Sequence, residues 1–125
     1  MSLYIVKKDK VLTMTRGDYF SFKVDLKSNK SRFDEDEYKL SEGDILFFGL
    51  MEPNQPFEKA FLKKQYTYDD YDVENGTLKI VLNPEDTIEL EPGTYYYQIK
   101  VLYEDETEVT HVDTVVQKTK FYIVD

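Results

Sequence analysis

The sequence predicts an all-β protein, built as an antiparallel sandwich or barrel of about 7–9 strands. Alanine, the strongest helix former, occurs only at Ala60, whereas tyrosine and phenylalanine, which favour strands, number 11 and 8. Between Phe20 and Leu26, apolar and polar residues alternate with the period of a half-buried strand. A helical protein of this length would not combine these two features.

Strands are expected at residues 3–6 with a continuation at 11–14, and then at 19–26, 44–51, 57–67, 77–82, 94–103 and 108–124. Residues 45–51 (ILFFGLM) are continuously apolar, which is typical of a strand covered on both faces. The charged segments 27–43 and 69–75 show no apolar period and are expected to be loops. We expect one helical turn begun at Asn83-Pro84, and a bend with a bulge near Asp113 in the last strand.

Length and composition limit the chemistry of the chain. Its 125 residues suit a single domain, 1–125. The absence of cysteine excludes disulfides and thiolate metal sites, and a net charge of -9 disfavours nucleic-acid binding. No apolar run approaches the roughly 18 residues of a membrane span, so no membrane association is expected. The N-terminus lacks the apolar segment of a signal peptide, which predicts a protein made in the cytoplasm.

Catalytic and metal sites are weakly indicated. His111 is the single histidine, and no motif of a nucleophile or of a zinc site accompanies it. The acidic runs 34–37 (DEDE) and 69–72 (DDYD) offer oxygen ligands for calcium without the spacing of a calcium loop. We expect no enzyme, no catalytic residue, no cofactor and no metal. The alternative of a small hydrolase requires a pocket with clustered carboxylates.

Residues 83–101 (NPEDTIELEPGTYYYQIKV) carry the most specific structural signal. They read as a crossing between two sheets, in which Leu90 enters the core and Pro92-Gly93 turns the chain into the next strand. A tyrosine at the start of that strand can donate its hydroxyl proton to upstream backbone, as in the tyrosine corner of immunoglobulin-like sandwiches. Tyr95 is favoured over Tyr96 for this role. The expected core residues are Phe20, Phe22, Leu90, Gly93, Tyr95, Tyr97 and Ile99.

Three segments, taken in order, resemble a family of phage and prophage virion proteins. They are residues 16–22 (RGDYFSF), residues 40–45 (LSEGDI), and Pro84–Thr87 followed by Leu90, Gly93, Tyr95, Tyr97 and Ile99. The chain is similar to the N-terminal immunoglobulin-like domain of baseplate upper proteins in phages of Gram-positive bacteria, and to small stand-alone prophage structural proteins. The resemblance runs from about residue 12 to 124 and implies an immunoglobulin-like β-sandwich.

The resemblance also implies a function. The chain is expected to be a non-enzymatic virion structural or assembly protein: a head decoration, a head fibre anchor, a connector accessory or a tail or baseplate component. It would be made in the host bacterial cytoplasm and reside in the virion. Its partners would be capsid, connector or tail subunits, with the chain itself present as a homo-oligomer or in many copies. Because the sequence ends at Asp125 without a fibre extension, a small subunit is expected. The alternative is a carbohydrate-binding or adhesive β-sandwich module.

Contacts with such partners are expected at exposed aromatic residues and at the two ends of the chain. Tyrosine is enriched at protein interfaces, and apolar ends fray unless they dock on something. The ends either pair within their own sandwich or dock on another subunit, and the sequence leaves both open. The candidate contact residues are Tyr66, Tyr68, Tyr71, Tyr4, Ile5, Phe121 and Tyr122.

Overall fold

The computed structural model describes residues 2–5, 10–31, 34–37, 40–105 and 107–125. The strands are β1 (Ser2–Ile5), β2 (Leu12–Thr15), β3 (Phe20–Val24), β4 (Leu26–Ser31), β5 (Asp34–Glu37), β6 (Ile45–Met51), β7 (Leu62–Tyr66), β8 (Tyr71–Asp72), β9 (Thr77–Leu82), β10 (Gly93–Glu104) and β11 (Thr110–Val124). Short helical turns are η1 (Phe57–Lys59), η2 (Tyr68–Asp70) and α1 (Pro84–Thr87). The protein is therefore all-β, as the sequence predicts.

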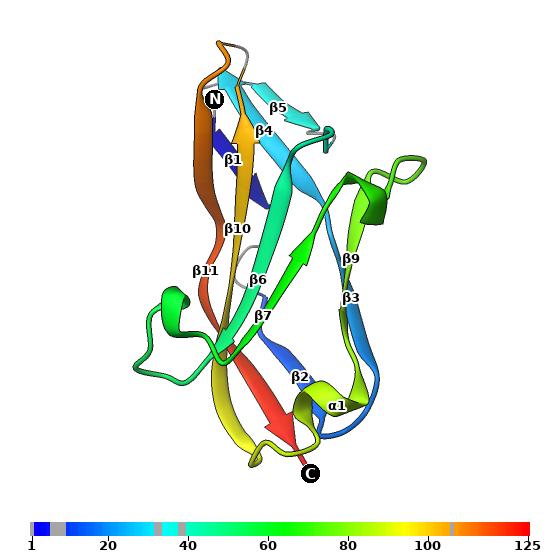
Figure 1. The fold of residues 1–125 in the computed structure, drawn as a ribbon, viewed down its shortest axis with the longest axis vertical. Helices are drawn as coiled ribbons and strands as arrows, with labels where there is room; N and C mark the ends of the chain where they lie inside the picture. The colour runs from blue at the N-terminus through cyan, green and yellow to red at the C-terminus, as the bar shows by residue number, and fades with distance from the viewer. Residues whose placement is uncertain (1, 6–9, 32–33, 38–39, 106) are drawn as a thin grey trace.

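The strands form three curled sheets (Figure 1). The largest has the order β2-β11-β10-β6-β7, a second has the order β3-β9-β8, and a third has the order β1-β4-β5. All described neighbours are antiparallel except β2 and β11, which are parallel. The expectation of antiparallel sheets therefore holds with that one exception. Strand β2 lies along one edge of β11, which β1 also contacts.

Three segments differ from the sequence prediction. The expected loop 27–43 contains most of β4 and all of β5, paired antiparallel with Lys27 opposite Glu37. A polar strand gives no period-2 signal, although its backbone pairs as well as any other. The expected strand 57–67 begins only at Leu62, because η1 follows Pro56 and folds over β6. The expected loop 69–75 holds part of η2 and the two-residue strand β8.

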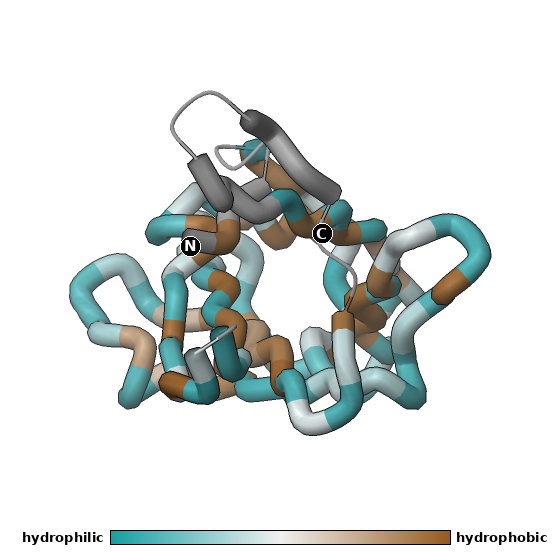
Figure 2. Tube along the Cα trace, turned by 90° about the horizontal axis from the view of Figure 1, so that it is seen from above, coloured by the Kyte–Doolittle hydropathy of each residue, from teal (hydrophilic) through white to brown (hydrophobic). Residues whose placement is uncertain are grey.

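The core lies between the five-stranded sheet and β3-β9-β8, and the chain surrounds it when seen from above (Figure 2). Alternate residues of β10 point inward, and Tyr95, Tyr97 and Ile99 are buried as predicted. Aromatic rings meet edge to face at the centre, with Tyr97 6.0 Å from both Phe22 and Phe121 between ring centroids. Such contacts add about 0.5–1.5 kcal/mol each beyond the burial of area.

Four expected core residues are less buried than predicted. Phe20 and Phe22 pack against the core but are only partly buried, since β3 is the edge of its sheet. Leu90 is also partly buried, because it follows α1 at one end of the molecule. Gly93 is exposed, and a Cβ placed on it would meet no atom within 4 Å. Gly93 therefore begins β10 outside the core.

The crossing from β9 to β10 has the predicted helical turn and the predicted tyrosine corner. Helix α1 follows Asn83, whose N–H donates to Oδ2 of Asp86 at 2.7 Å. The hydroxyl of Tyr95 donates to the carbonyl oxygen of Glu91 at 2.6 Å, so Tyr95 rather than Tyr96 forms the corner. Burial raises the pKa of Tyr95, so its hydroxyl keeps its proton. The bond fixes the angle at which β10 enters the sheet.

The turn at residues 16–18 is tied to the same crossing. The N–H of Gly17 donates to Oγ1 of the buried Thr87 at 2.9 Å. Gly17 has φ +79°, and a Cβ on it would lie 2.5 Å from Cδ1 of Ile88. Arg16 forms an ion pair with Asp125 at 2.8 Å. These contacts hold the start of β3, the crossing and the end of β11 together.

The predicted bulge in β11 lies a few residues beyond Asp113. The pairing with β10 shifts register twice, between the partners of Tyr97 and Ile99 and between those of Ile99 and Lys100. Val115 and Val116 are consecutive and both buried, which an unbroken strand could not achieve. The two shifts account for the failure of simple alternation in this segment.

Candidate contact surface

The three tyrosines expected to form an exposed contact cluster face the core instead. Tyr71 is 9% exposed, and Tyr66 and Tyr68 are partly buried against the core. The backbone N–H of Val81 donates to the hydroxyl of Tyr66 at 3.1 Å. Burial raises the pKa of Tyr66. These side chains hold the fold together and leave little surface for a partner.

The contact of Tyr66 is part of a seam between β7, the edge of the large sheet, and β9 of the smaller one. Nζ of Lys64 on β7 lies 2.6 Å from Oδ2 of Asp86 in α1. Both side chains are largely buried, at 20% and 16% relative exposure. Side chains rather than a backbone ladder therefore connect the two sheets along the described part of this seam.

Both ends of the chain pair within the fold over the described residues. Strand β1 pairs with β4, and the buried Leu3 donates its N–H to Oδ2 of Asp113 at 2.9 Å. The last residues of β11 lie between β10 and β2, and Phe121 is fully buried. Phe121 therefore belongs to the core and is unavailable as a contact in this fold. The side chains of Tyr4 and Ile5 fall outside the described residues.

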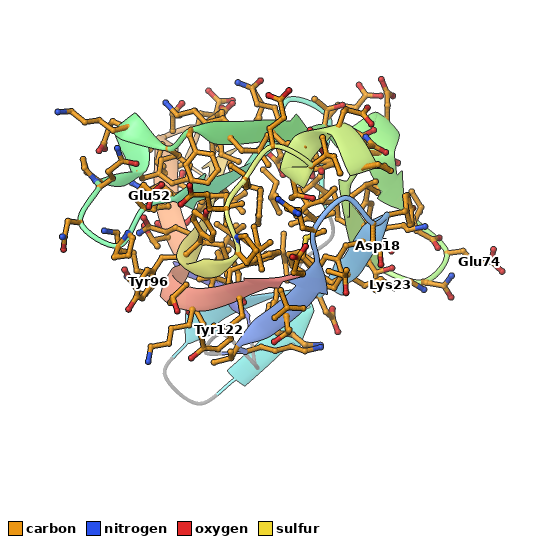
Figure 3. The ribbon with its side chains drawn as sticks, turned by 90° about the horizontal axis from the view of Figure 1, so that it is seen from below. Asp18, Lys23, Glu52, Glu74, Tyr96 and Tyr122 are labelled. Atoms are coloured by element: carbon orange, nitrogen blue, oxygen red, sulfur yellow. The ribbon has the colours of Figure 1, made fainter. Side chains whose placement is uncertain are left out.

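Tyr122 is the candidate contact residue that stays on the surface. It lies on the outer face of the five-stranded sheet, opposite Thr13 of β2 and Thr94 of β10. It also lines a shallow, mostly apolar hollow with Pro92 and Val124. Figure 3 shows Tyr122 and Tyr96 on the outside of the sheet. Tyr96 follows Thr94 on the outer face of β10. Because Thr94 lies directly opposite Tyr122, Tyr96 is a diagonal neighbour of Tyr122.

The rest of this outer face combines apolar residues with lysines. Ile45, Leu102 and Val112 form a row across β6, β10 and β11, and Val112 is 57% exposed. Four exposed or half-exposed lysines lie on the same sheet: Lys63, Lys100, Lys118 and Lys120. This face was not predicted from the sequence. The signal was present, since every residue between two inward residues of β10 must point outward.

A polar cluster at the β10–β11 hairpin contains the single histidine. Nε2 of His111 lies 2.6 Å from Oδ2 of Asp105, and the imidazole stacks on Tyr103 with centroids 5.3 Å apart. The hydroxyl of Thr107 donates to Oδ1 of Asp105. This hydrogen bond, together with those from the N–H of Val109 and from His111, lowers the pKa of the Asp105 carboxyl. These bonds brace the hairpin, and the described residues around His111 show no arrangement of a nucleophile and a base.

The hydroxyl of Tyr103 donates a hydrogen bond to Oδ2 of Asp113 at 2.6 Å. The same oxygen accepts the hydrogen bond from the backbone N–H of Leu3. Burial and this carboxylate raise the pKa of Tyr103. Strands β1, β10 and β11 are thereby joined at one buried point. The cluster is a structural joint of the fold.

The acidic runs lie in different surroundings. Residues 34–37 form the edge strand β5. Asp69 and Asp70 lie in η2, where Oδ2 of Asp70 accepts the N–H of Thr67 at 2.9 Å. Within the described part of the chain, no three histidine, aspartate or glutamate side chains gather as a metal site would require. The expectation of no metal stays a prediction.

Comparison with known proteins gave no matching family model and no similar sequence among curated proteins. Among the described residues, no helix has the length and apolar character needed to cross a membrane. The described residues thus form a β-protein whose five-stranded sheet has a partly exposed outer face of mixed apolar and basic residues.

Proposed function

We propose that this chain is an immunoglobulin-like β-sandwich that serves as a non-enzymatic subunit of a phage particle, acting through protein–protein contacts. The observation that carries the fold is the tyrosine corner, in which the hydroxyl of Tyr95 bonds the carbonyl of Glu91. It occurs in the segment on which the family resemblance rests, at the start of the penultimate strand, as in immunoglobulin-like domains.

Strand pairing supports the same fold. In an immunoglobulin-like sandwich, one sheet contains strands A, B, E and D, and the other contains C, F and G. Strands β3, β9 and β8 have the pairing order of B, E and D, and β11, β10 and β6 have that of G, F and C. Strand β7 then corresponds to C′, while β1 beside β4 and β2 beside β11 correspond to a first strand shared between sheets.

The virion role is supported by the resemblance of residues 16–22, 40–45 and 84–99 to phage structural proteins. A subunit of this kind needs a stable scaffold and a surface for partners. The outer face of the five-stranded sheet supplies a surface with exposed aromatic, aliphatic and lysine residues. Head, connector and tail positions are all compatible with this proposal.

The test is whether the chain is part of particles. Phage particles are induced from the bacterium that carries the gene, purified by density gradient, and analysed by quantitative mass spectrometry. We expect peptides of this chain at a fixed ratio to the major capsid protein across gradient fractions. Its absence from intact particles, with the protein present in the lysate, would contradict the proposal.

A second function is favoured by one observation. Tyr122 lines a shallow apolar hollow and has Tyr96 as its diagonal neighbour, an arrangement on which a sugar ring can stack. An adhesive module of this kind would bind host-wall glycans. A glycan array would detect it, and binding should be lost in Tyr122→Ala but kept in Tyr19→Ala, which removes an exposed tyrosine from a different part of the surface.

A further inference from the structure

The outer face of the five-stranded sheet carries several lysines, whereas many exposed acids lie near η2 and β8. Lysines on the outer face of the five-stranded sheet, which we call the lysine face, are Lys63, Lys100, Lys118 and Lys120. The outward positions of these strands carry one acid, Glu104, and the nearby connection between β6 and β7 adds Glu52, Glu58 and Lys59. The face is therefore net positive in a chain whose net charge is -9.

The lysine face is also uncompensated. Nζ of Lys63 bonds the backbone carbonyl of Glu58, and Nζ of Lys100 lies 4.9 Å above the ring of Phe57. Within the described residues, none of the four lysines forms an ion pair with a carboxylate. Apolar side chains at Phe47 and Leu102 lie on the same face, so a partner could cover apolar area and pair the lysines together.

Acids gather on the other side of the molecule, in a region that we call the acidic end. It consists of Glu42, Asp69, Asp70, Asp72 and Glu74, all exposed. Glu42 and Asp69 line one open hollow with Gly43, Thr67 and Tyr68. Hydrogen bonds from Asn75 lower the pKa of Asp72, and the nearby charge of Lys23 acts in the same direction. Figure 3 shows Glu74 remote from Tyr96, which lies on the outer face of the five-stranded sheet, and shows Lys23 on the same side as Glu74.

We propose that the lysine face of one copy binds the acidic end of a second copy, so that the subunits associate head to tail. Complementary charge steers and registers such a contact. A two-fold dimer through the lysine face would set lysines against lysines, and one through the acidic end would set acids against acids. Head-to-tail contacts close into a ring or continue as a chain. This inference deepens the proposed role as a multi-copy subunit and rests on that role for its biological setting.

The experiment is sedimentation of the purified full chain over about a hundredfold range of concentration, at low and at high salt. We expect reversible self-association that weakens at high salt, because exposed charges are screened within about a Debye length. A chain that stays monomeric at every concentration in low salt overturns the proposal. Particle incorporation is measured separately, so a monomeric chain found in particles would remove the head-to-tail contact and leave the proposed function intact.

Charge reversals locate the contact. Lys100→Glu with Lys120→Glu should weaken association by about tenfold or more. The same loss is expected for Glu42→Lys with Asp69→Lys and Glu74→Lys, because three of the five acids must be reversed to make the acidic end positive. Lys79→Glu reverses an exposed charge outside the lysine face, on β9 beside the acidic end. It is the control for charge reversal in general and should not weaken association. Thermal melting of each variant verifies folding.

The decisive measurement mixes the double lysine variant with the triple acid variant. Each alone presents like charges at both surfaces, whereas the mixture offers a positive face to a negative end, and a negative face to a positive end. Restored association in the mixture supports the head-to-tail contact. Unchanged association of the acidic-end variant alone would show that two sheet faces meet, and would overturn the proposal.

Discussion

Removing one oxygen atom from the tyrosine corner tests the fold most sharply. In Tyr95→Phe the ring stays, with its 5.6 Å edge contact to Phe61, and only the 2.6 Å bond to the carbonyl of Glu91 is lost. Tyr95 is 6% exposed, so water cannot fully replace the lost donor. A hydrogen bond of this kind contributes about 1 kcal/mol net to the free energy of unfolding.

That loss translates into a measurable melting shift. For 125 residues, the entropy of unfolding is about 0.26 kcal/mol/K, so a loss of about 1 kcal/mol lowers the melting temperature by about 4 °C. The matched control is Tyr96→Phe, the next residue on the outer face, where a change of less than about 0.5 kcal/mol is expected. Calorimetry on both variants decides the matter. Equal shifts, or no shift for Tyr95→Phe, would refute the claim that the corner bond supports the crossing.

Four further predictions follow from packing, backbone and charge. Leu90→Ala should lower the free energy of unfolding by about 1–2 kcal/mol, less than the 2–5 kcal/mol expected for Ile99→Ala, because Leu90 is only partly buried. Urea unfolding of both variants would test this order, and equal losses would place Leu90 deep in the core. Gly17→Ala should destabilise the fold through its positive φ and the approach to the neighbouring isoleucine, while Gly93→Ala should be tolerated in open space; melting temperatures that rank the other way contradict this. The pKa of Asp105 is lowered in the native state, so its charged carboxylate stabilises the native state at pH values above about 4, the usual pKa of an aspartate. This stabilisation is lost progressively as the pH falls below about 4, and Asp105→Asn should therefore flatten the acid limb of a curve of stability against pH. Millimolar calcium should leave the melting temperature unchanged, since a site occupied at 100 times its dissociation constant would add about 2.7 kcal/mol.

Much of the fold is readable from local chemistry. Alternation from Tyr95 to Val101 specifies a strand with a buried face, and the structure has it. Asn83 and Pro84 specify the helical turn α1, and the tyrosine corner follows from a tyrosine placed just after the turn at Gly93. These features depend on residues close together in the sequence, where conformational preference and side-chain reach are decided locally.

The hairpin of β4 and β5 could not be read in the same way. Its strands have no apolar period, and their pairing depends on backbone hydrogen bonds that any sequence can make. The tyrosines of residues 66–71 were expected on the surface for a related reason. A half-polar side chain suits either a surface or a core rim, and only the position of β9 beside Tyr66 gives its hydroxyl a partner.

Local sequence was enough to predict an all-β chain, the position of most of its strands, and a bond from Tyr95 to upstream backbone in the crossing between two sheets. Which residues remain exposed depended on long-range contacts. Phe121 and Tyr122 are adjacent and chemically alike, yet one is enclosed by the core and the other faces outward. The same holds for the lysine face, whose members come from β7, β10 and β11. Residues far apart in sequence become one surface only when the strands that carry them pair, because register and sheet order arise from long-range contacts.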